Sequence, residues 1–142
     1  MEALKQQIEN LIENGNYNKA IDVLAKAFNI KLKVKDVEYK AMNWDKNQKR
    51  YVFKLQLMRG KRSYTFEFGQ SIAKANEEPN LYDVLTCLQK YEVGTFEDFC
   101  SEFGYDEDSR TAEKTYKAVV KEFEAMERLF NSEELEVLQL IQ

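Results

Sequence analysis

Hydrophobic side chains recur every three or four positions through residues 1–30, the spacing that places them on one face of a helix. Gly15 interrupts this pattern and is expected to end a first helix, and Asn16 can cap a second one. The apolar positions are Leu4, Ile8, Leu11, Ile12, Ala20, Ile21, Leu24 and Phe28. Because the predicted connection is very short, the two helices are expected to form an antiparallel hairpin.

The period shortens to two residues over residues 31–69, which predicts three β-strands. Leu32 and Val34 alternate with lysines, and the alternation continues from Val37 on the opposite parity. A change of parity within one strand indicates an extra residue, so we expect a β-bulge near Asp36.

Turn-forming residues separate the predicted strands. Residues 44–48 have turn chemistry, and Arg59-Gly60-Lys61 predicts a tight reversal. The second and third strands each have one apolar face, formed by Tyr51, Phe53, Leu55, Leu57, Tyr64, Phe66 and Phe68. Consecutive strands with short connections predict an antiparallel β-meander that helices cover on one face.

The rest of the chain returns to helical spacing after a polar stretch that contains the only proline. Thr95 and Asp98 resemble a capping box at the start of a short helix, which Gly104 would end. A long helix is expected over residues 109–130, and Ser132 can cap a last helix.

These patterns predict one α+β domain over residues 1–142, made of an N-terminal helical hairpin (1–30), a three-stranded antiparallel β-meander (31–69) and a C-terminal helical layer (81–142). The chain is 44% hydrophobic and 32% charged, with 5 glycines and 1 proline, which excludes a disordered or low-complexity protein. No apolar run approaches the roughly 18 residues of a membrane span, and the first residues lack the apolar core of a signal peptide. We therefore expect a cytoplasmic protein with no membrane partner.

The chain has 2 cysteines and no histidine. Cys87 and Cys100 lack the spacing of a zinc site, and their apolar neighbours predict buried structural thiols. Without histidine, Ser-His catalysis, Cys-His catalysis and imidazole metal sites are excluded. No glycine-rich phosphate-binding motif is present. We therefore expect a protein that is not an enzyme and that uses no cofactor or metal.

One pattern points to catalysis instead. Glu38 and Lys40 share a strand face in the arrangement Glu-x-Lys, which many metal-dependent nucleases use to hold magnesium and to stabilise charge near the attacking water. Such an enzyme also needs an acidic residue from outside this triplet, and no Pro-Asp pair precedes it here. Alternating charge on an exposed strand explains the same residues, so the nuclease is the weaker alternative.

Charge is divided unevenly along the chain. Residues 1–75 hold 15 basic and 8 acidic side chains, a balance of +7, and residues 76–142 hold 6 basic and 17 acidic ones, a balance of −11. Such asymmetry points to charged partners, unless the two halves neutralise each other within the fold.

The cations of the basic half gather around the meander turns, beside aromatic residues such as Trp44 and Tyr51. Cations next to aromatic rings can neutralise phosphates and stack on bases, so this region is a candidate nucleic-acid-binding surface. Sheet edges also carry Lys and Arg for protection against aggregation, which explains the same residues. The candidate nucleic-acid contacts are Lys49, Arg50, Arg59, Lys61 and Arg62.

The acidic half gathers six carboxylates over residues 97–108. A surface of this kind can occupy a basic channel built for nucleic acid, and electrostatic attraction speeds its association. A solvated helix face with acidic residues in its first turn explains the same pattern. The candidate partner-binding residues are Glu97, Asp98, Glu102, Asp106, Glu107 and Asp108.

Three stretches resemble small proteins encoded by bacteriophages and integrative elements: residues 62–69 (RSYTFEFG), 81–88 (LYDVLTCL) and 94–106 (GTFEDFCSEFGYD). The similarity runs from about Tyr39 to the C-terminus, and the N-terminal hairpin looks like a separate addition. Proteins of this genetic setting often inhibit bacterial defence by stoichiometric binding, as anti-CRISPR proteins do. The resemblance supplies no catalytic residues, and it implies a host protein or nucleoprotein complex as the partner, in the bacterial cytoplasm.

The leading functional prediction is therefore a non-enzymatic phage or mobile-element protein that binds and inhibits a host nucleic-acid-handling complex through its acidic surface. The alternative is a nucleic-acid-binding accessory protein that uses the basic meander. The two differ in salt dependence, because direct binding to phosphates weakens steeply as salt increases.

Overall fold

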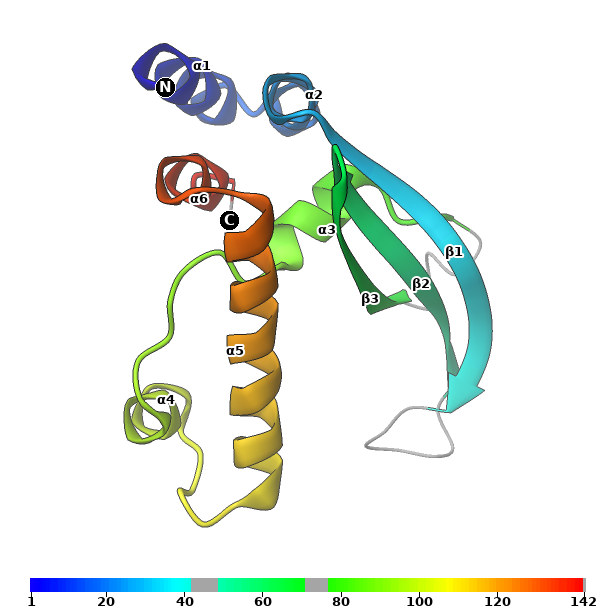
Figure 1. Cartoon of the computed structure of the whole chain (residues 1–142), viewed down its shortest axis with the longest axis vertical. Coiled ribbons are helices and arrows are strands. Elements are labelled where there is room, and N and C mark those ends of the chain that lie inside the picture. The colour runs from blue at the N-terminus through cyan, green and yellow to red at the C-terminus, as the bar shows by residue number, and fades with distance from the viewer. Residues whose placement is uncertain (42–48, 71–76, 142) are drawn as a thin grey trace.

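The computed structural model describes residues 1–41, 49–70 and 77–141 (Figure 1). In chain order the elements are the helices α1 (Glu2–Glu13) and α2 (Tyr17–Phe28), the strands β1 (Ile30–Ala41), β2 (Lys49–Arg59) and β3 (Arg62–Gln70), and the helices α3 (Leu81–Cys87), α4 (Phe96–Phe103), α5 (Arg110–Leu129) and α6 (Ser132–Gln139). This order confirms the predicted α+β class, with a helical hairpin, a meander and a C-terminal helical layer.

The three strands form one antiparallel sheet in the order β1-β2-β3. Val34 pairs with Leu55 and Asp36 pairs with Lys54, so the register shifts at Lys35. The change of parity predicted this irregularity. It lets the apolar side chains before and after Lys35 lie on the same face of the sheet.

A two-residue turn joins β2 to β3. Arg59 pairs with Arg62 across it, and Gly60 has a φ of +62°, a left-handed backbone that glycine adopts without strain. The tight reversal predicted here is confirmed. The turn predicted at residues 44–48 lies outside the described residues.

One apolar core joins the sheet to both sets of helices. Leu55 and Leu57 of β2 are fully buried. Figure 1 shows α5 standing beside the sheet, with α6 and α1 near its C-terminal end. Toward the other end of the sheet the apolar face opens to solvent, because Val37 and Tyr39 are 45% and 61% exposed. The helices contribute Ile8, Leu24, Phe28, Val84, Leu85, Met126, Leu129, Phe130 and Leu138 to this core.

Reciprocal side-chain bonds start three of the C-terminal helices, α3, α4 and α6. At α4 the Thr95 hydroxyl accepts the Asp98 N–H, and the Asp98 carboxylate accepts the Thr95 N–H, which is the predicted capping box. At α6 the cap is Asn131, and the prediction of Ser132 is wrong by one residue. Asn131 takes this position because its side chain and that of Glu134 bond each other's backbone N–H groups at 2.9 Å.

Two glycines mark helix ends. α4 ends at Gly104, which has a φ of +73°, as predicted. The C-cap of α1 is Asn14, one residue before the predicted Gly15, which follows with a φ of +75°. Asn16 holds the N-cap position of α2, but its side chain accepts no cap hydrogen bond.

Arg59 joins the tip of the β2–β3 hairpin to the C-terminal helices. Its guanidinium pairs with both carboxylate oxygens of Glu134 and donates to the Leu129 carbonyl oxygen at 2.9 Å. It also lies over the rings of Phe28 and Phe130, 5.5 and 5.2 Å from their centroids. The hydrogen bonds from Arg59 lower the pKa of the Glu134 carboxyl. The predicted surface cation is therefore an internal anchor.

The two cysteines differ in environment. Cys100 is buried, as predicted, on the inner side of α4. Cys87 is exposed, so the expectation of a second buried thiol is wrong. It is the last residue of α3, whose buried face is formed by Val84 and Leu85. The apolar neighbours in sequence lie on a different side of the helix from the thiol.

Lys90 is a fully buried cation in the link between α3 and α4. Its Nζ donates to the Leu85 carbonyl oxygen near the end of α3, and its own carbonyl accepts the Gln139 side-chain N–H at 3.0 Å. Burial lowers the pKa of the Lys90 ammonium to about 8. The sequence did not predict this residue as part of the interior.

Candidate functional site

The predicted acidic surface lies on α4 and on the turn that leads into α5. Figure 1 shows α4 against the N-terminal half of α5, on the side away from the sheet. An aromatic cluster holds it there: the Phe99 ring lies 5.3 Å from Tyr116 and 5.6 Å from Tyr105, and the Phe96 ring lies 5.5 Å from Tyr116. The Tyr116 hydroxyl donates to the Gly94 carbonyl oxygen at 2.7 Å. This surface therefore has a fixed place on α5.

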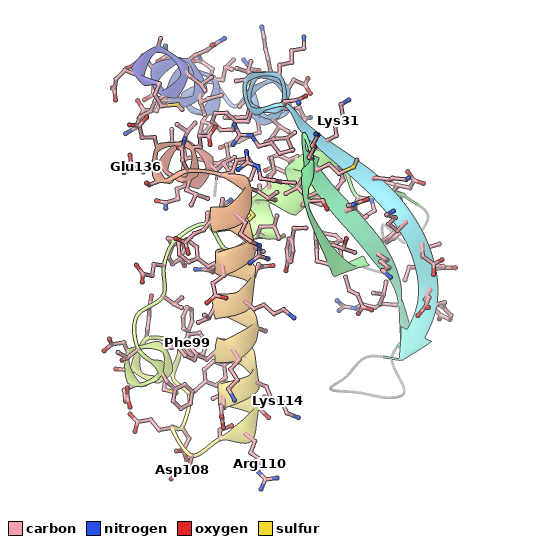
Figure 2. All side chains as sticks on the ribbon, in the orientation of Figure 1. Lys31, Phe99, Asp108, Arg110, Lys114 and Glu136 are labelled. Carbon is pink, nitrogen blue, oxygen red and sulfur yellow. The ribbon has the colours of Figure 1, made fainter. Side chains whose placement is uncertain are left out.

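All six predicted carboxylates are exposed, and the structure brings them to one end of the molecule. Two have local structural bonds: Asp98 completes the cap of α4, and the Asp106 carboxylate accepts the Asp108 N–H at 3.0 Å. Over residues 1–41, 49–70 and 77–141, none of the six forms an ion pair with a cation. Figure 2 shows Asp108 at the bottom of the molecule, below Phe99.

The carboxylates influence the buried thiol beside them. Burial raises the pKa of Cys100, and the charges of Glu107, Glu97 and Asp106 raise it further. A negative potential therefore extends over the base of α4. A thiol in this environment stays protonated and unreactive.

Two aromatic side chains stand among the acids. Phe103 is 52% exposed and Tyr105 is 41% exposed, although both contact the Phe99 ring. Aromatic side chains carry a large share of binding energy where they become buried at an interface. The surface is therefore acidic and aromatic together, a property that the charge pattern alone did not reveal.

A hollow of about 440 Å³ lies on the same side of α5, next to the start of α4. Three exposed carboxylates, Glu92, Glu124 and Glu127, surround an apolar floor that includes Val120 and Phe123. Such a hollow fits the aliphatic stem and charged end of a lysine or arginine. The sequence analysis did not predict this hollow. The pattern that indicates it is the spacing of Glu124 and Glu127, three residues apart and one helical turn after Val120 and Phe123.

The structure does not bring the five candidate nucleic-acid contacts together. Lys49 and Arg50 start β2, and Arg59 ends it, roughly 30 Å away at about 3.3 Å per residue. Arg62 donates to the Arg128 carbonyl oxygen at 3.0 Å and so bonds the C-terminal end of α5. Lys61 is exposed in the turn between Arg59 and Arg62, both of which bond the helical layer.

Glu38 lies on the face of the sheet opposite the core, next to a small pocket of about 160 Å³. Lys54 stands in this pocket between two carboxylates, because it pairs with Asp36 on β1 and with Glu67 on β3. Within the described residues, no group of three or more His, Cys, Asp or Glu side chains could hold a metal ion. The arrangement around Glu38 is that of cross-strand charge pairing.

The acidic surface and the meander lie on opposite sides of α5 (Figure 1). Arg59 and Glu134 connect the basic and acidic halves of the chain, but Glu134 belongs to α6 and not to the acidic surface. The charges of α4 and its following turn are therefore available to another molecule.

In the described part of the chain, no helix is both long enough and apolar enough to cross a membrane. No protein-family model matches the chain, and neither does any curated protein or solved structure with which it was compared.

Proposed function

We propose that this protein is a non-enzymatic binding module whose acidic surface occupies a basic site on a host nucleic-acid-handling complex and inhibits it. The observation that supports this most is the joint exposure of six carboxylates and two aromatic rings on one rigid side of α5. The phage or mobile-element setting and the anti-defence role rest on the sequence resemblance described above.

The charges favour a cationic partner for two reasons. A field of one sign steers an oppositely charged surface and raises the association rate. The carboxylates also form no ion pair within the described residues, so a partner does not have to displace one. Channels that bind nucleic acid are lined with lysine and arginine, which makes them the matching class of surface.

The aromatic side chains supply what charge alone does not. Exposed ion pairs contribute little to stability of a complex because water screens them. Phe103 and Tyr105 can bury apolar area at the centre of the same interface, and the hollow at Glu124 can accept one basic side chain from the partner. The expected interface is thus an aromatic centre with an acidic rim.

The test is capture of partners from bacterial host lysate, with and without nuclease, by the protein and by two triple variants. Glu97→Lys, Glu102→Lys and Glu107→Lys reverse three of the six charges and so neutralise the surface, without removing a carboxylate that caps a helix or bonds a turn. Glu13→Lys, Asp22→Lys and Glu136→Lys make the same change in net charge at exposed positions elsewhere.

The proposal expects a defined protein complex that survives nuclease, that the first variant loses and that the second retains. Inhibition of that complex by the purified protein then completes the test. Retained capture by the folded first variant contradicts the proposal. Recovery of DNA or RNA, with protein partners lost on digestion, would favour the nucleic-acid-binding alternative instead.

A further inference from the structure

A second, separate surface lies on the other side of α5. A groove of about 580 Å³ runs between α5 and the edge strand β3. Figure 2 shows the sheet diverging from the lower half of α5, with Lys114 and Arg110 labelled on that half. The groove is lined by Tyr64, Thr65, Phe66, Glu67, Lys114, Thr115, Ala118, Val119, Lys121 and Glu122.

The wall of the groove on the sheet side is the edge of β3 itself. Consecutive strand residues point to opposite faces, yet Thr65 lines the groove together with its neighbours Tyr64 and Phe66. Side chains from both faces of a strand can line one groove only where that groove runs along the edge of the strand. Because β3 is last in the sheet, no further strand pairs with this edge in the described residues. Helix α5 lies beside the edge across the groove.

The register tells which backbone groups face the groove. Arg59 and Arg62 close a two-residue turn, so they form a hydrogen-bonded pair, and such pairs then alternate along the hairpin. Tyr64 and Phe66 therefore direct their N–H and C=O groups toward β2. Ser63 and Thr65 direct theirs away from β2, toward the edge.

The opposite wall carries two lysines and one carboxylate. Lys114 and Lys121 are exposed and lie seven residues apart, so they share one face of α5 at a spacing of roughly 10 Å. Neither forms an ion pair within the part of the chain that the structure describes, whereas Lys117 pairs with Glu113 at 2.9 Å. The Glu122 carboxylate on the same wall accepts the Gln89 N–H at 3.0 Å, and burial raises its pKa.

We propose that the groove between β3 and α5 binds an extended acidic segment of a partner protein, which adds to the sheet as a fourth strand beside β3. A peptide backbone matches the alternating donors and acceptors of Ser63 and Thr65. Every second side chain of the added strand faces α5, and carboxylates at those positions reach Lys114 and Lys121. The stacked rings of Tyr64 and Phe66, 5.1 Å apart, form an apolar floor under them.

A single nucleic-acid strand fits these walls less well. Phosphates would meet the two lysines, but they offer no match to a row of backbone groups in β-spacing. The proposal does not depend on the acidic surface of α4, because the two surfaces lie on opposite sides of α5.

The test is a fluorescence anisotropy titration with a short fluorescein-labelled peptide that alternates glutamate with valine. Thr65→Pro removes the outward N–H without removing a bond to β2, and we expect it to weaken binding about tenfold or more. Thr65→Ala keeps the N–H and is expected to bind like the unmodified protein. Lys114→Glu with Lys121→Glu is expected to lower affinity at least about tenfold, and Lys117→Ala to leave it unchanged.

The probe provides a check that is independent of folding. N-methylation along one edge of the peptide should abolish binding, and methylation along the other edge should not, because only one edge faces β3. No binding up to about 1 mM peptide, equal loss with both methylated peptides, or unchanged affinity of folded Thr65→Pro would each overturn the proposal. Displacement of the peptide by oligothymidylate, with tighter binding of that probe, would assign the groove to nucleic acid instead.

Discussion

Replacement of Arg59 by methionine is expected to destabilise the protein by about 3–5 kcal/mol, the cost of removing one partner from a buried ion pair. Methionine keeps an apolar side chain between the Phe28 and Phe130 rings, so packing is largely retained. What is lost is the pairing to Glu134 and the bond to the Leu129 carbonyl oxygen. The Glu134 carboxylate then remains buried without its ion-pair partner.

The loss is large for a protein of this size. At about 3 °C per kcal/mol, the midpoint of thermal unfolding should fall by about 10–15 °C. Glu134→Gln keeps an acceptor for the Asn131 N–H, so its cost should come mainly from Arg59, and the double variant should cost less than the two single variants added together. The exposed neighbour Lys61→Met is the control, with an expected change below about 0.5 kcal/mol.

The pH dependence of stability follows from the same pair. Because Arg59 lowers the pKa of Glu134 in the folded state, the pair stabilises the protein above the unfolded carboxyl pKa of about 4.3, and this contribution is lost as pH falls through the folded value. Arg59→Met should therefore flatten the acid limb of the stability curve, measured by urea unfolding at several pH values. A cost below about 1 kcal/mol at pH 7 would show that Arg59 is a surface cation and refute this account.

Two further predictions concern local features. Lys90→Met should stabilise the protein near pH 7, and it should remove a rise of up to about 3 kcal/mol in unfolding free energy between pH 8 and 10.5, where the native ammonium releases its proton before the unfolded one does. Urea titrations of both proteins at pH 7 and 10 test this, and parallel profiles would contradict it. Gly104→Ala should cost about 1–2 kcal/mol, since a side chain at a φ of +73° is strained although the space around it is open, and a thermal melt measures this cost. Gly94→Ala is not a suitable control, because its Cβ would lie 2.9 Å from the Asp98 carboxylate. Glu102→Ala, at an exposed position of the same helix, is the appropriate control, and an unchanged midpoint in Gly104→Ala would refute the strain.

The regular parts of the fold were predictable because each depends on residues close in sequence. The shift of parity around Asp36 indicated the register shift, and Gly60 between two cations indicated the hairpin turn. The N-cap of the last helix was predicted one residue too late, because Asn131 and Ser132 are both good cap residues. The choice between them depends on the distance to Glu134, which only Asn131 matches as a capping box.

The candidate sites were predictable only in part. The acidic positions were visible as a cluster in sequence, whereas the exposure of Phe103 and Tyr105 depends on how α4 sits on α5. Arg59 is two residues from Leu57 on β2, so its side chain lies on the same inward face of the sheet. Its place beside a turn had indicated a surface cation instead. The groove combines Thr65 with Lys114, and residues so far apart in sequence meet only through the packing of α5 beside β3.

The bond between Arg59 and Glu134 also orders events during synthesis. The two residues are 75 positions apart, so at about 5–20 residues per second the hairpin is made roughly 4–15 s before its acceptor. Until then Phe28 and the inner face of β2 have no C-terminal helices to cover them. During this interval the apolar face of the sheet is exposed and prone to association with other chains. Synthesis of the last helix is the step that ends this exposure.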